Sequence, residues 1–334
     1  MKAFTVTRYG PTGLEAAEIS APDVGPHDVL VDVRAASINP LDKMVRNGEF
    51  KQLLRYKPPF VLGHDLAGVV TRVGADVANF TIGDEVYSRP RDLRIGAFAE
   101  TIAIDADDVA LKPTSLSFEE AAAVPLVALA AWQALVDVAG VQAGQKVLVH
   151  AGAGGLGSTV IQVARHLGAH VATTAHTKDI DKVRALGADE AIDYTTTDFA
   201  DVLSGYDVVL DSLGLSSLEK SLTVLKPGGL AISVVGPPDL AFATQLGQPL
   251  LKPVLAFMSH KVRSRAKKLG VRYSFLFMRA SGPQLKTLAR LYDDGTLRPV
   301  LDRSFPFADT IEAMAFVEQG QANGKVVVTR GNAA

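Results

Sequence analysis

The clearest chemical signal in the chain is a set of three glycines with the spacing G-x-G-x-x-G inside the stretch KVLVHAGAGGLG at 146–157. These glycines are Gly152, Gly154 and Gly157. An apolar run precedes them, and apolar residues recur at i, i+3, i+4 and i+7 from Val160, so we expect a strand, a tight turn and a helix. Glycine at these positions allows the turn and lets backbone N–H groups approach a pyrophosphate at the positive end of the helix dipole. A second β-like run, HVATT, starts at His170 and favours nucleotide binding over an ordinary glycine-rich loop.

The residues that end this second run indicate which dinucleotide is bound. A site for NAD usually has Asp or Glu there, about 20 residues past the glycine motif, to accept a hydrogen bond from the ribose 2′-OH. This chain has no acidic residue within 173–178. Lys178 and the hydroxyls of Thr174 and Thr177 could hold a 2′-phosphate instead, although Thr177 could also cap the next helix. We therefore expect the cofactor to be NADPH.

Metal chemistry and nucleophilic catalysis find little support. The sequence has no cysteine, and His64 in GHDLAG is the only histidine in a motif-like setting. A three-ligand zinc site is therefore not expected, and we interpret His64 as a hydrogen-bonded structural residue. No G-x-S-x-G elbow, Tyr-x-x-x-Lys pair or P-loop occurs, so hydrolase, short-chain reductase and kinase chemistry are not predicted.

The composition is that of an ordinary globular protein. Its 334 residues are 48% hydrophobic and 21% charged, and a formal charge of −2 argues against broad binding to nucleic acid. The longest apolar stretch, from Ala121 to Trp132, is too short to span a bilayer and is broken by Pro125, so no integral membrane segment is expected. We expect a cytoplasmic protein, although a folded organelle protein that had lost a transit peptide would look the same.

Two patterns divide the chain. Residues 1 to about 115 are β-rich and predict a small barrel, and Ser117 with Glu120 forms a capping box that starts a helix interrupted by Pro125. From Lys146 strands and helices alternate, which predicts a parallel sheet with helices on both faces. We expect strands near 146–151, 170–174, 191–194, 206–211, 230–235 and 271–278, helices near 157–167, 179–186, 198–204, 215–225 and 283–293, and a final strand KVVVT. The long connection 236–270 is interpreted as a helical excursion with a basic tail, KVRSRAKK.

Motifs along nearly the whole chain resemble those of a known family. They are SINPLDKMVRNG at 37–48, GHDLAGVVTRVG at 63–74, FTIGDEVY at 80–87, the block 124–194, DSLG at 211–214, LKPGG at 225–229 and GKVVV at 324–328. With these motifs the chain resembles the zinc-independent branch of the medium-chain dehydrogenase/reductases, the quinone oxidoreductase or zeta-crystallin-like group. The resemblance implies an α/β protein with a GroES-like β-barrel catalytic domain at 1–123 and 282–334 and a doubly wound Rossmann nucleotide-binding domain at 124–281. It also implies a homodimer joined through the strand RYSFLFM at 272–278.

The resemblance further implies roles for individual residues. Asn39 stands where zinc-dependent relatives have a cysteine ligand, and His64 stands where they have another ligand. Asn39 and Asp42 are implied to lie at the cleft near the nicotinamide. The implied cofactor contacts are Gly152, Gly154, Gly155, Leu156 and Gly157 for the pyrophosphate; Thr174, Lys178 and Tyr194 for the ribose and its phosphate; Leu213 and Val235 on the adenine and nicotinamide sides; and Phe275, Phe277 and Lys325 over the nicotinamide end.

Together these features predict an NADPH-dependent, zinc-independent reductase that transfers hydride to a quinone or an α,β-unsaturated carbonyl compound. Such substrates delocalise the charge that hydride addition creates, so no Lewis acid is needed. Asn39 can donate through its amide, and Tyr56 and Tyr87 are candidate proton donors or wall residues of the barrel. Two alternatives stay open: an enoyl-thioester reductase whose basic run at 261–268 binds the carrier's phosphates, and a non-catalytic nucleotide-binding protein of the same fold.

Overall fold

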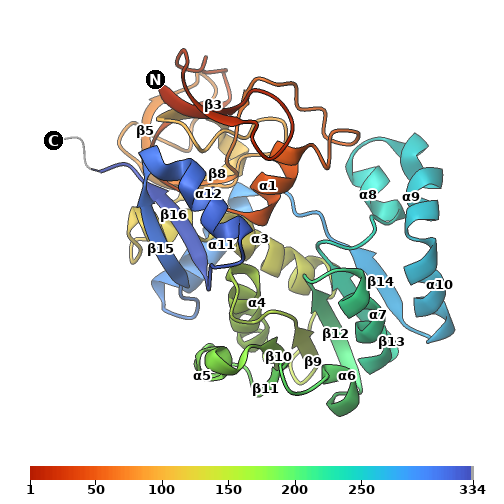
Figure 1. Cartoon of the computed structure of the whole chain (residues 1–334). Coiled ribbons are helices and arrows are strands. Elements are labelled where there is room, and N and C mark those ends of the chain that lie inside the picture. Colours follow the sequence, from red (N-terminus) through yellow and green to blue (C-terminus); the bar gives the residue numbers. More distant parts are fainter. Residues whose placement is uncertain (332–334) are drawn as a thin grey trace. The chain divides into compact units, whose positions relative to one another are not determined.

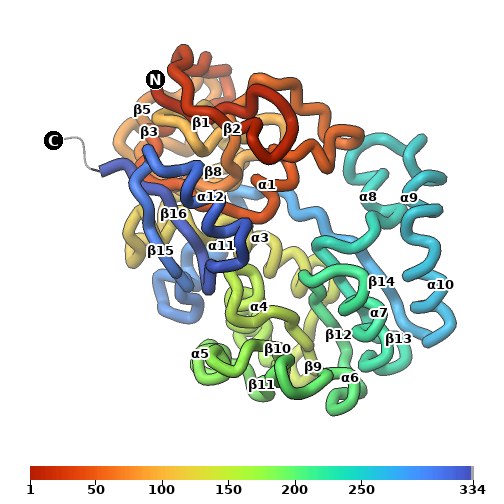
Figure 2. Tube along the Cα trace, in the orientation of Figure 1, coloured from red at the N-terminus to blue at the C-terminus, as the bar shows by residue number. Residues whose placement is uncertain are grey.

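The computed structural model describes residues 1–331, which form two compact units. The first unit contains Met1–Leu129 and the chain from Arg279 onward, and the second contains Ala130–Met278. Figures 1 and 2 show that both chain ends lie in the first unit, so the second unit is an insertion within it. The expected domain boundaries at 123/124 and 281/282 lie a few residues from these divisions and stay a prediction for where separately folding domains divide.

The first unit is built on β3 (Asp28–Ile38), the long central strand of a seven-stranded sheet. Val29, Val31 and Val33 point into the core and are almost completely buried, as their alternation with polar residues predicts. The sheet order is β15-β16-β3-β5-β6-β8, with β7 also paired to β3, and a separate small sheet has the order β2-β1-β4. Register shifts between β3 and β5 mark bulges, which bend the strands and let the sheet curve toward a barrel.

The other strands of the first unit are β1 (Lys2–Val6), β2 (Leu14–Glu18), β4 (Phe60–Val61), β5 (Asp65–Val73), β6 (Glu85–Ser88), β7 (Thr101–Asp105), β8 (Val109–Leu111), β15 (Leu301–Pro306) and β16 (Lys325–Thr329). Its helices are α1 (Pro40–Asn47), α2 (Phe118–Ala122), α11 (Gly282–Asp293) and α12 (Thr310–Glu318), with short 3-10 turns at Ala106–Asp108 and Phe307–Asp309. The expected capping box is present at α2, where Ser117 accepts from the Glu120 N–H, and Pro125 begins a new helix, α3 (Pro125–Trp132). Sequence analysis missed α1, because PLDKMVRN is short and lies within a region rich in β-strand patterns.

The second unit is a parallel sheet in the order β11-β10-β9-β12-β13-β14 (Figure 1). Its strands are β9 (Lys146–Val149), β10 (His170–Ala175), β11 (Glu190–Asp193), β12 (Tyr206–Asp211), β13 (Leu225–Ser233) and β14 (Arg272–Phe275). The direction of strand order reverses between β9 and β12, and ligands of such sheets bind beyond the carboxyl ends of strands at this point. The predicted doubly wound nucleotide-binding sheet is therefore confirmed. The largest differences are that β13 begins at Leu225 rather than near 230 and that β14 ends at Phe275 rather than at 278.

Helices connect these strands as alternation predicts. They are α4 (Gly155–His166), α5 (Ile180–Ala185), α6 (Phe199–Val202), α7 (Leu215–Val224), α8 (Leu240–Gln245), α9 (Lys252–Met258) and α10 (His260–Lys268), with 3-10 turns at Thr177–Asp179 and Pro249–Leu251 and a π-helix at Gln133–Val138. The excursion between β13 and β14 is helical, as expected, and α10 contributes Val262 and Ala266 to a core that also includes Phe199 and Leu218. No helix in residues 1–331 is long and apolar enough to cross a membrane.

One buried histidine, His150, contacts side chains from three other elements of the second unit. His150, directly after β9, is 1% exposed, and its ring nitrogens lie 3.2 Å from Thr174 Oγ1 and 2.8 Å from Ser221 Oγ. Its ring packs edge-on against Phe199 at 4.6 Å. Burial lowers the pKa of His150 from 6.5 to about 4, because the charged imidazolium loses hydration that no acidic partner replaces.

His150 should therefore make stability depend on pH. The folded state keeps it neutral while the unfolded chain takes up a proton below pH 6.5, so unfolding binds protons between pH 6.5 and about 4. The free energy of unfolding should fall as pH falls through this window, by on the order of 3 kcal/mol in total from this residue. Above pH 6.5 the titration of His150 should add no pH dependence. Denaturant unfolding of the wild type, His150→Gln and, as an exposed control, His166→Gln should show a shallower slope for His150→Gln only. Parallel pH profiles for all three proteins would contradict this.

Candidate active site

Five polar side chains converge at one edge of the seven-stranded sheet. They are Asn39, Asp42, His64, Asp65 and Lys325, each at most 5% exposed. Strand register explains why residues so distant in sequence meet: Ser37 near the end of β3 pairs with Asp65 at the start of β5, and Ile38 pairs with Val326 in β16. Because neighbouring antiparallel strands begin where their partners end, all these residues lie at the same edge. The structure thus brings Asn39, Asp42 and Lys325 of the sequence prediction together.

Lys325, Asn39 and Asp65 form a buried hydrogen-bonded network. The Lys325 ammonium donates to Asn39 Oδ1 at 2.5 Å and lies 3.5 Å from Asp65 Oδ2. Asn39 Nδ2 donates to Asp65 Oδ2 at 2.9 Å and to the Ser37 carbonyl at 3.4 Å. Burial lowers the pKa of Lys325, while the negative charges of Asp65 and Asp42 oppose that shift. Both amide protons of Asn39 are therefore engaged within the protein, and the ammonium carries the positive charge of the site.

Asp42 and His64 form the second half of the cluster. Asp42, in α1, accepts from the Asn39 backbone N–H at 2.7 Å through Oδ2, and its Oδ1 lies 2.6 Å from His64 Nδ1. Because an ionised carboxylate can only accept, Nδ1 of His64 is the donor in this bond. His64 Nε2 is buried and has no hydrogen-bond partner within residues 1–331. His64 is thus a hydrogen-bonded residue, as expected, with one ring nitrogen left over.

The donor set of this cluster does not fit zinc. Zinc sites use three or four ligands from Cys, His, Asp or Glu, and no group of three such side chains in the described part of the chain could hold a metal ion. An amide stands at position 39, and the Lys325 ammonium lies against its oxygen and near Asp65. A second cation beside this ammonium would be repelled, and the ammonium already compensates the carboxylate.

The two candidate tyrosines, Tyr56 and Tyr87, differ in how their hydroxyl groups are hydrogen-bonded. Tyr87 is 0% exposed and donates its hydroxyl proton to the Leu285 carbonyl at 2.6 Å. Tyr56 stacks on Phe60 at 5.0 Å, and its hydroxyl oxygen accepts from the Leu93 N–H at 2.9 Å. Burial, with the negative charge of Asp92, raises the pKa of Tyr56. Tyr87 therefore has no free proton for a substrate, whereas the hydroxyl proton of Tyr56 is not committed by these contacts.

The glycine motif of the second unit has the geometry of a pyrophosphate site. A Cβ on Gly152 would lie 2.1 Å from Thr173 Oγ1, and one on Gly157 would lie 2.3 Å from the Ala151 carbonyl oxygen, so both glycines are required by packing. A Cβ on Gly154 would meet only the Ala151 oxygen, at 3.4 Å. Gly154 caps the N-terminus of α4, where the first N–H groups lack partners within the helix. The open space at Gly154 therefore fits a phosphate rather than a side chain.

Of the three residues expected at the ribose, two are exposed on the surface and one is buried. Thr174 is 2% exposed, and its hydroxyl accepts from the Ala151 N–H while contacting His150, so it faces the interior. Lys178 and Tyr194 are exposed. Asp193, at the end of β11, accepts from the Thr177 hydroxyl at 2.6 Å, and bonds from Thr177 and Thr195 lower its pKa. A carboxylate therefore lies against Thr177, the residue before Lys178, although none occurs in the β10 segment itself.

The remaining predicted cofactor residues lie at the carboxyl ends of strands. Leu213 follows β12 and Val235 follows β13, and both are exposed, as residues that contact a ligand at this sheet edge should be. Phe275 and Phe277 instead pack against Phe242 of α8, with ring centroids 5.2 and 5.1 Å from it. These two phenylalanines are buried within their own unit.

Sequence reasoning missed three charged residues that the structure places at these sites. Asp65 follows His64 in the same motif and is the acceptor that holds Asn39, Lys325 and the Leu126 N–H. Lys182 donates to the Ala153 carbonyl in the glycine loop, and its spacing of four from Lys178 on a helix could have indicated it. Arg89 is buried beyond the end of β6, and no pattern in the sequence marks it.

Comparison with known proteins agrees with this geometry. Residues 25–114 match the alcohol dehydrogenase GroES-like domain, and residues 186–328 match the family described as zinc-binding dehydrogenase. The chain is 35% identical to 2-methylene-furan-3-one reductase of Solanum lycopersicum, over 98% of this chain and 79% of that protein. It is 34% identical to the chloroplastic NADPH-dependent alkenal/one oxidoreductase of Arabidopsis thaliana, with the same coverage. The quinone oxidoreductase from Coxiella burnetii superposes with a TM-score of 0.86 at 31% identity, covering 99% of both chains.

Fold, nucleotide site and relatives together define an oxidoreductase that uses a nicotinamide cofactor. The chain belongs to the medium-chain dehydrogenase/reductase family, within the group that includes quinone oxidoreductases and zeta-crystallin-like proteins. The expected family and fold class are thereby confirmed.

The two packing environments in the glycine motif give a test of its function. Gly154→Ala fits the protein, so its melting temperature should match the wild type, but the new methyl group would intrude on a pyrophosphate and weaken NADPH binding by about 1–3 kcal/mol. Gly152→Ala should instead lower the melting temperature, because its Cβ would clash inside the protein. Calorimetric titration and thermal unfolding measure both. Unchanged NADPH affinity in Gly154→Ala would show that the pyrophosphate does not bind there.

Proposed function

We propose that this protein is an NADPH-dependent, zinc-independent reductase of quinones or α,β-unsaturated carbonyl compounds. The observation that carries the proposal is the Lys325–Asn39–Asp65 network, in which an amide stands at the position implied to be a cysteine ligand in zinc-dependent relatives and an ammonium lies against that amide. Without a metal to polarise an alcohol or ketone, the substrate must itself delocalise the added charge. The names of the tomato and Arabidopsis relatives, which act on conjugated carbonyl compounds, support the same substrate class.

The reaction needs few groups from the protein. When bound, the reduced nicotinamide supplies a hydride. The hydride adds to the β-carbon of an enone, the electron pair moves to the carbonyl oxygen, and a proton then reaches the α-carbon. The chain must position the conjugated system and stabilise the transient enolate oxygen. The buried Lys325 ammonium supplies positive potential at this sheet edge, and the uncommitted hydroxyl proton of Tyr56 makes it the better proton-donor candidate of the two tyrosines.

Two further parts of the proposal concern assembly and location. β14 is an edge strand of the six-stranded sheet, so its outer side is available to pair with a second copy in a homodimer. A monomeric mass by sedimentation equilibrium would refute the dimer.

Cytoplasmic location also stays a prediction, since one relative is named as chloroplastic. Detection of the native protein in a membrane-enclosed organelle would overturn it.

The substrate class is tested by NADPH consumption with matched compounds. Methyl vinyl ketone and benzoquinone should be reduced, whereas butanone, the saturated counterpart of the enone, should not, and a chelator should leave the rates unchanged. Crotonyl-CoA tests the thioester alternative, because a strong preference for it over the free enone would favour that reading. Rapid oxidation of saturated alcohols without enone or quinone reduction, or activity lost to the chelator and restored by zinc, would overturn the proposal.

Cofactor preference is tested at Lys178. If its exposed ammonium binds the 2′-phosphate, NADPH should bind more tightly than NADH, and Lys178→Ala should reduce that advantage by about 1–3 kcal/mol. Lys268→Ala, which removes an exposed lysine at the end of α10, should leave the preference unchanged. Dissociation constants for both cofactors provide the measurement. Equal affinities for the two cofactors in the wild type would overturn the assignment of Lys178 to the 2′-phosphate.

A further inference from the structure

Arg89 is the largest fully buried side chain among the described residues. Its Nη2 donates to Asp92 Oδ1 at 2.8 Å, but Nε and Nη1 have no hydrogen-bond partner within residues 1–331. A buried charged donor without an acceptor is costly, and native proteins keep such groups mainly where a ligand or ordered water completes them. The guanidinium of Arg89 therefore has free hydrogen-bonding capacity inside the first unit.

The strand register places Arg89 at the candidate active site. Ser88, the last residue of β6, pairs with Leu66 in β5, so the register brings the backbone of Arg89, the residue after β6, level with Asp65. This is the edge at which Asn39 and Lys325 converge on Asp65. Arg89 and Tyr56 also contact neighbouring residues of one loop, since Arg89 pairs with Asp92 and the Tyr56 hydroxyl accepts from the Leu93 N–H.

The loop that follows Arg89 is held rigidly from its outer side. Arg91 makes two bonds to the Asp108 carboxylate through its side chain, at 2.7 and 2.9 Å, and Arg94 donates to Asp28 at 2.7 Å. Between them, Leu93 has φ of 68°, a left-handed conformation unusual for leucine, and its N–H donates to Tyr56. Backbone conformations of this kind persist where surrounding contacts enforce them, often at functional sites.

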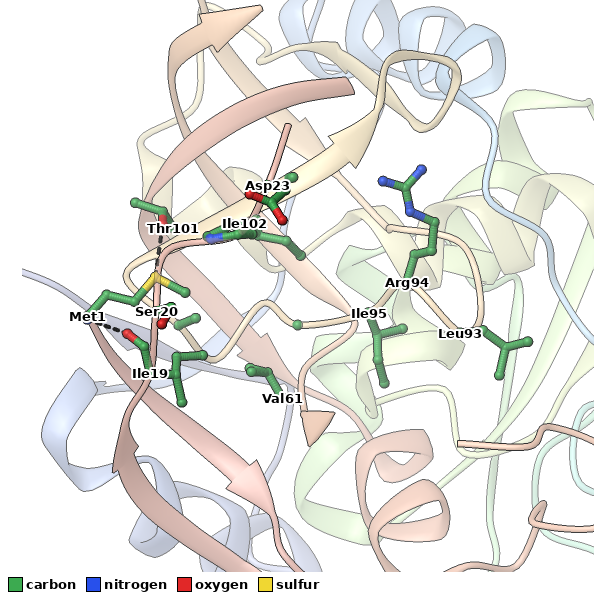
Figure 3. A pocket seen from close by; sticks show the side chains of 14 residues that line it. Met1, Ile19, Ser20, Asp23, Val61, Leu93, Arg94, Ile95, Thr101 and Ile102 are labelled. Carbon is green, nitrogen blue, oxygen red and sulfur yellow. Dashed lines mark hydrogen bonds between the residues drawn. The ribbon is translucent and has the colours of Figure 1, made fainter. Parts of the chain in front are cut away.

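The two sides of this loop differ in the state of their arginines. On the outer side Leu93, Arg94 and Ile95 border an open hollow of about 330 Å³ with Met1 and Thr101 (Figure 3). Arg94 there is paired with Asp28 and lies 3.8 Å from Asp105. Arg89, in contrast, is buried and retains two nitrogens without acceptors. The unsatisfied arginine is therefore the one at the Asn39–Asp65–Lys325 edge.

We propose that Arg89 is a substrate-binding residue that receives a carboxylate of the substrate, so that the preferred enones are acidic. This inference rests on the proposed enone reductase activity. A planar guanidinium matches a carboxylate in geometry, and hydrogen bonds between charged partners are roughly twice as strong as neutral ones. A neutral carbonyl oxygen would leave more of the buried donor capacity unfilled. Asp92 is 22% exposed and engages only Nη2, so it does not replace the substrate.

The test compares trans-acetylacrylate, an enone with one carboxylate, with its methyl ester. The wild type should have a higher kcat/KM for the acid than for the ester, and Arg89→Met should lower this ratio by about 10- to 100-fold, the range for a hydrogen bond between charged groups. Arg89→Lys keeps the charge without the planar fork and should give an intermediate ratio. Arg55→Met, which removes an exposed arginine next to Tyr56, is the matched control and should keep the wild-type ratio.

A binding measurement separates this inference from the proposed activity. Levulinate, the saturated acid that corresponds to reduced acetylacrylate, should bind to the wild type in calorimetric titration and at least 10-fold more weakly to Arg89→Met. Thermal unfolding checks that each variant is folded. If Arg89→Met does not fold, two measurements on the wild type decide whether the site prefers a carboxylate: the acid-to-ester ratio and the levulinate titration. An acid-to-ester ratio of one or less in the wild type, or levulinate binding that Arg89→Met does not weaken, would overturn the role of Arg89. Reduction of neither acid nor ester, with levulinate still bound through Arg89, would instead count against the proposed reductase activity.

Discussion

The buried charge of Lys325 is the constraint on which the first unit depends. An ammonium that is 5% exposed must be compensated inside the protein, and Asp65 supplies the negative charge while Asn39 supplies an acceptor. Asp65 also accepts from the Ser37 hydroxyl and, through its other oxygen, from the Leu126 N–H at the first turn of α3. One carboxylate thus connects β3, β5, β16 and the start of a helix, and any substitution that removes it would leave the buried ammonium without the negative charge of Asp65.

This network explains how one fold supports different chemistries. The resemblance to zinc-dependent relatives implies that the position of Asn39 holds a metal ligand in those proteins, where the metal polarises an oxygen of the substrate. Here the positive charge is an amino group attached to β16, fixed by hydrogen bonds rather than by metal coordination. Its potential can stabilise charge that a conjugated substrate has already spread over several atoms, which is a smaller demand than activating a saturated alcohol. The nucleotide-binding unit keeps the glycine loop and strand order typical of its fold in either case.

The sequence predicted the second unit better than the first. Parallel strands and helices have strong periodic signals, so β9 to β13 and α4 to α7 could be located, and the glycine spacing identified the α4 N-terminus. The helix α1 is only eight residues long, so its apolar Leu41, Met44 and Val45 span little more than one turn of a helical period, yet it positions Asp42. Asp65 and Arg89 were missed for a different reason: their roles arise from the register of β5 against β3 and β6, and no local pattern encodes such long-range pairing. Thr174 was predicted as a cofactor contact from its hydroxyl at the end of the second strand and from the family resemblance, and the structure turns this hydroxyl inward to His150.

The regiochemistry of reduction tests the central claim most directly. Incubation of benzalacetone with the protein and NADPH in D₂O, followed by NMR of the product, distinguishes addition to the carbon–carbon double bond from addition to the carbonyl group. The account predicts the saturated ketone, with hydrogen from the cofactor at the β-carbon and deuterium from solvent at the α-carbon. An allylic alcohol would mean that the carbonyl group itself is polarised and reduced, and it would contradict the role assigned to the Lys325–Asn39–Asp65 network.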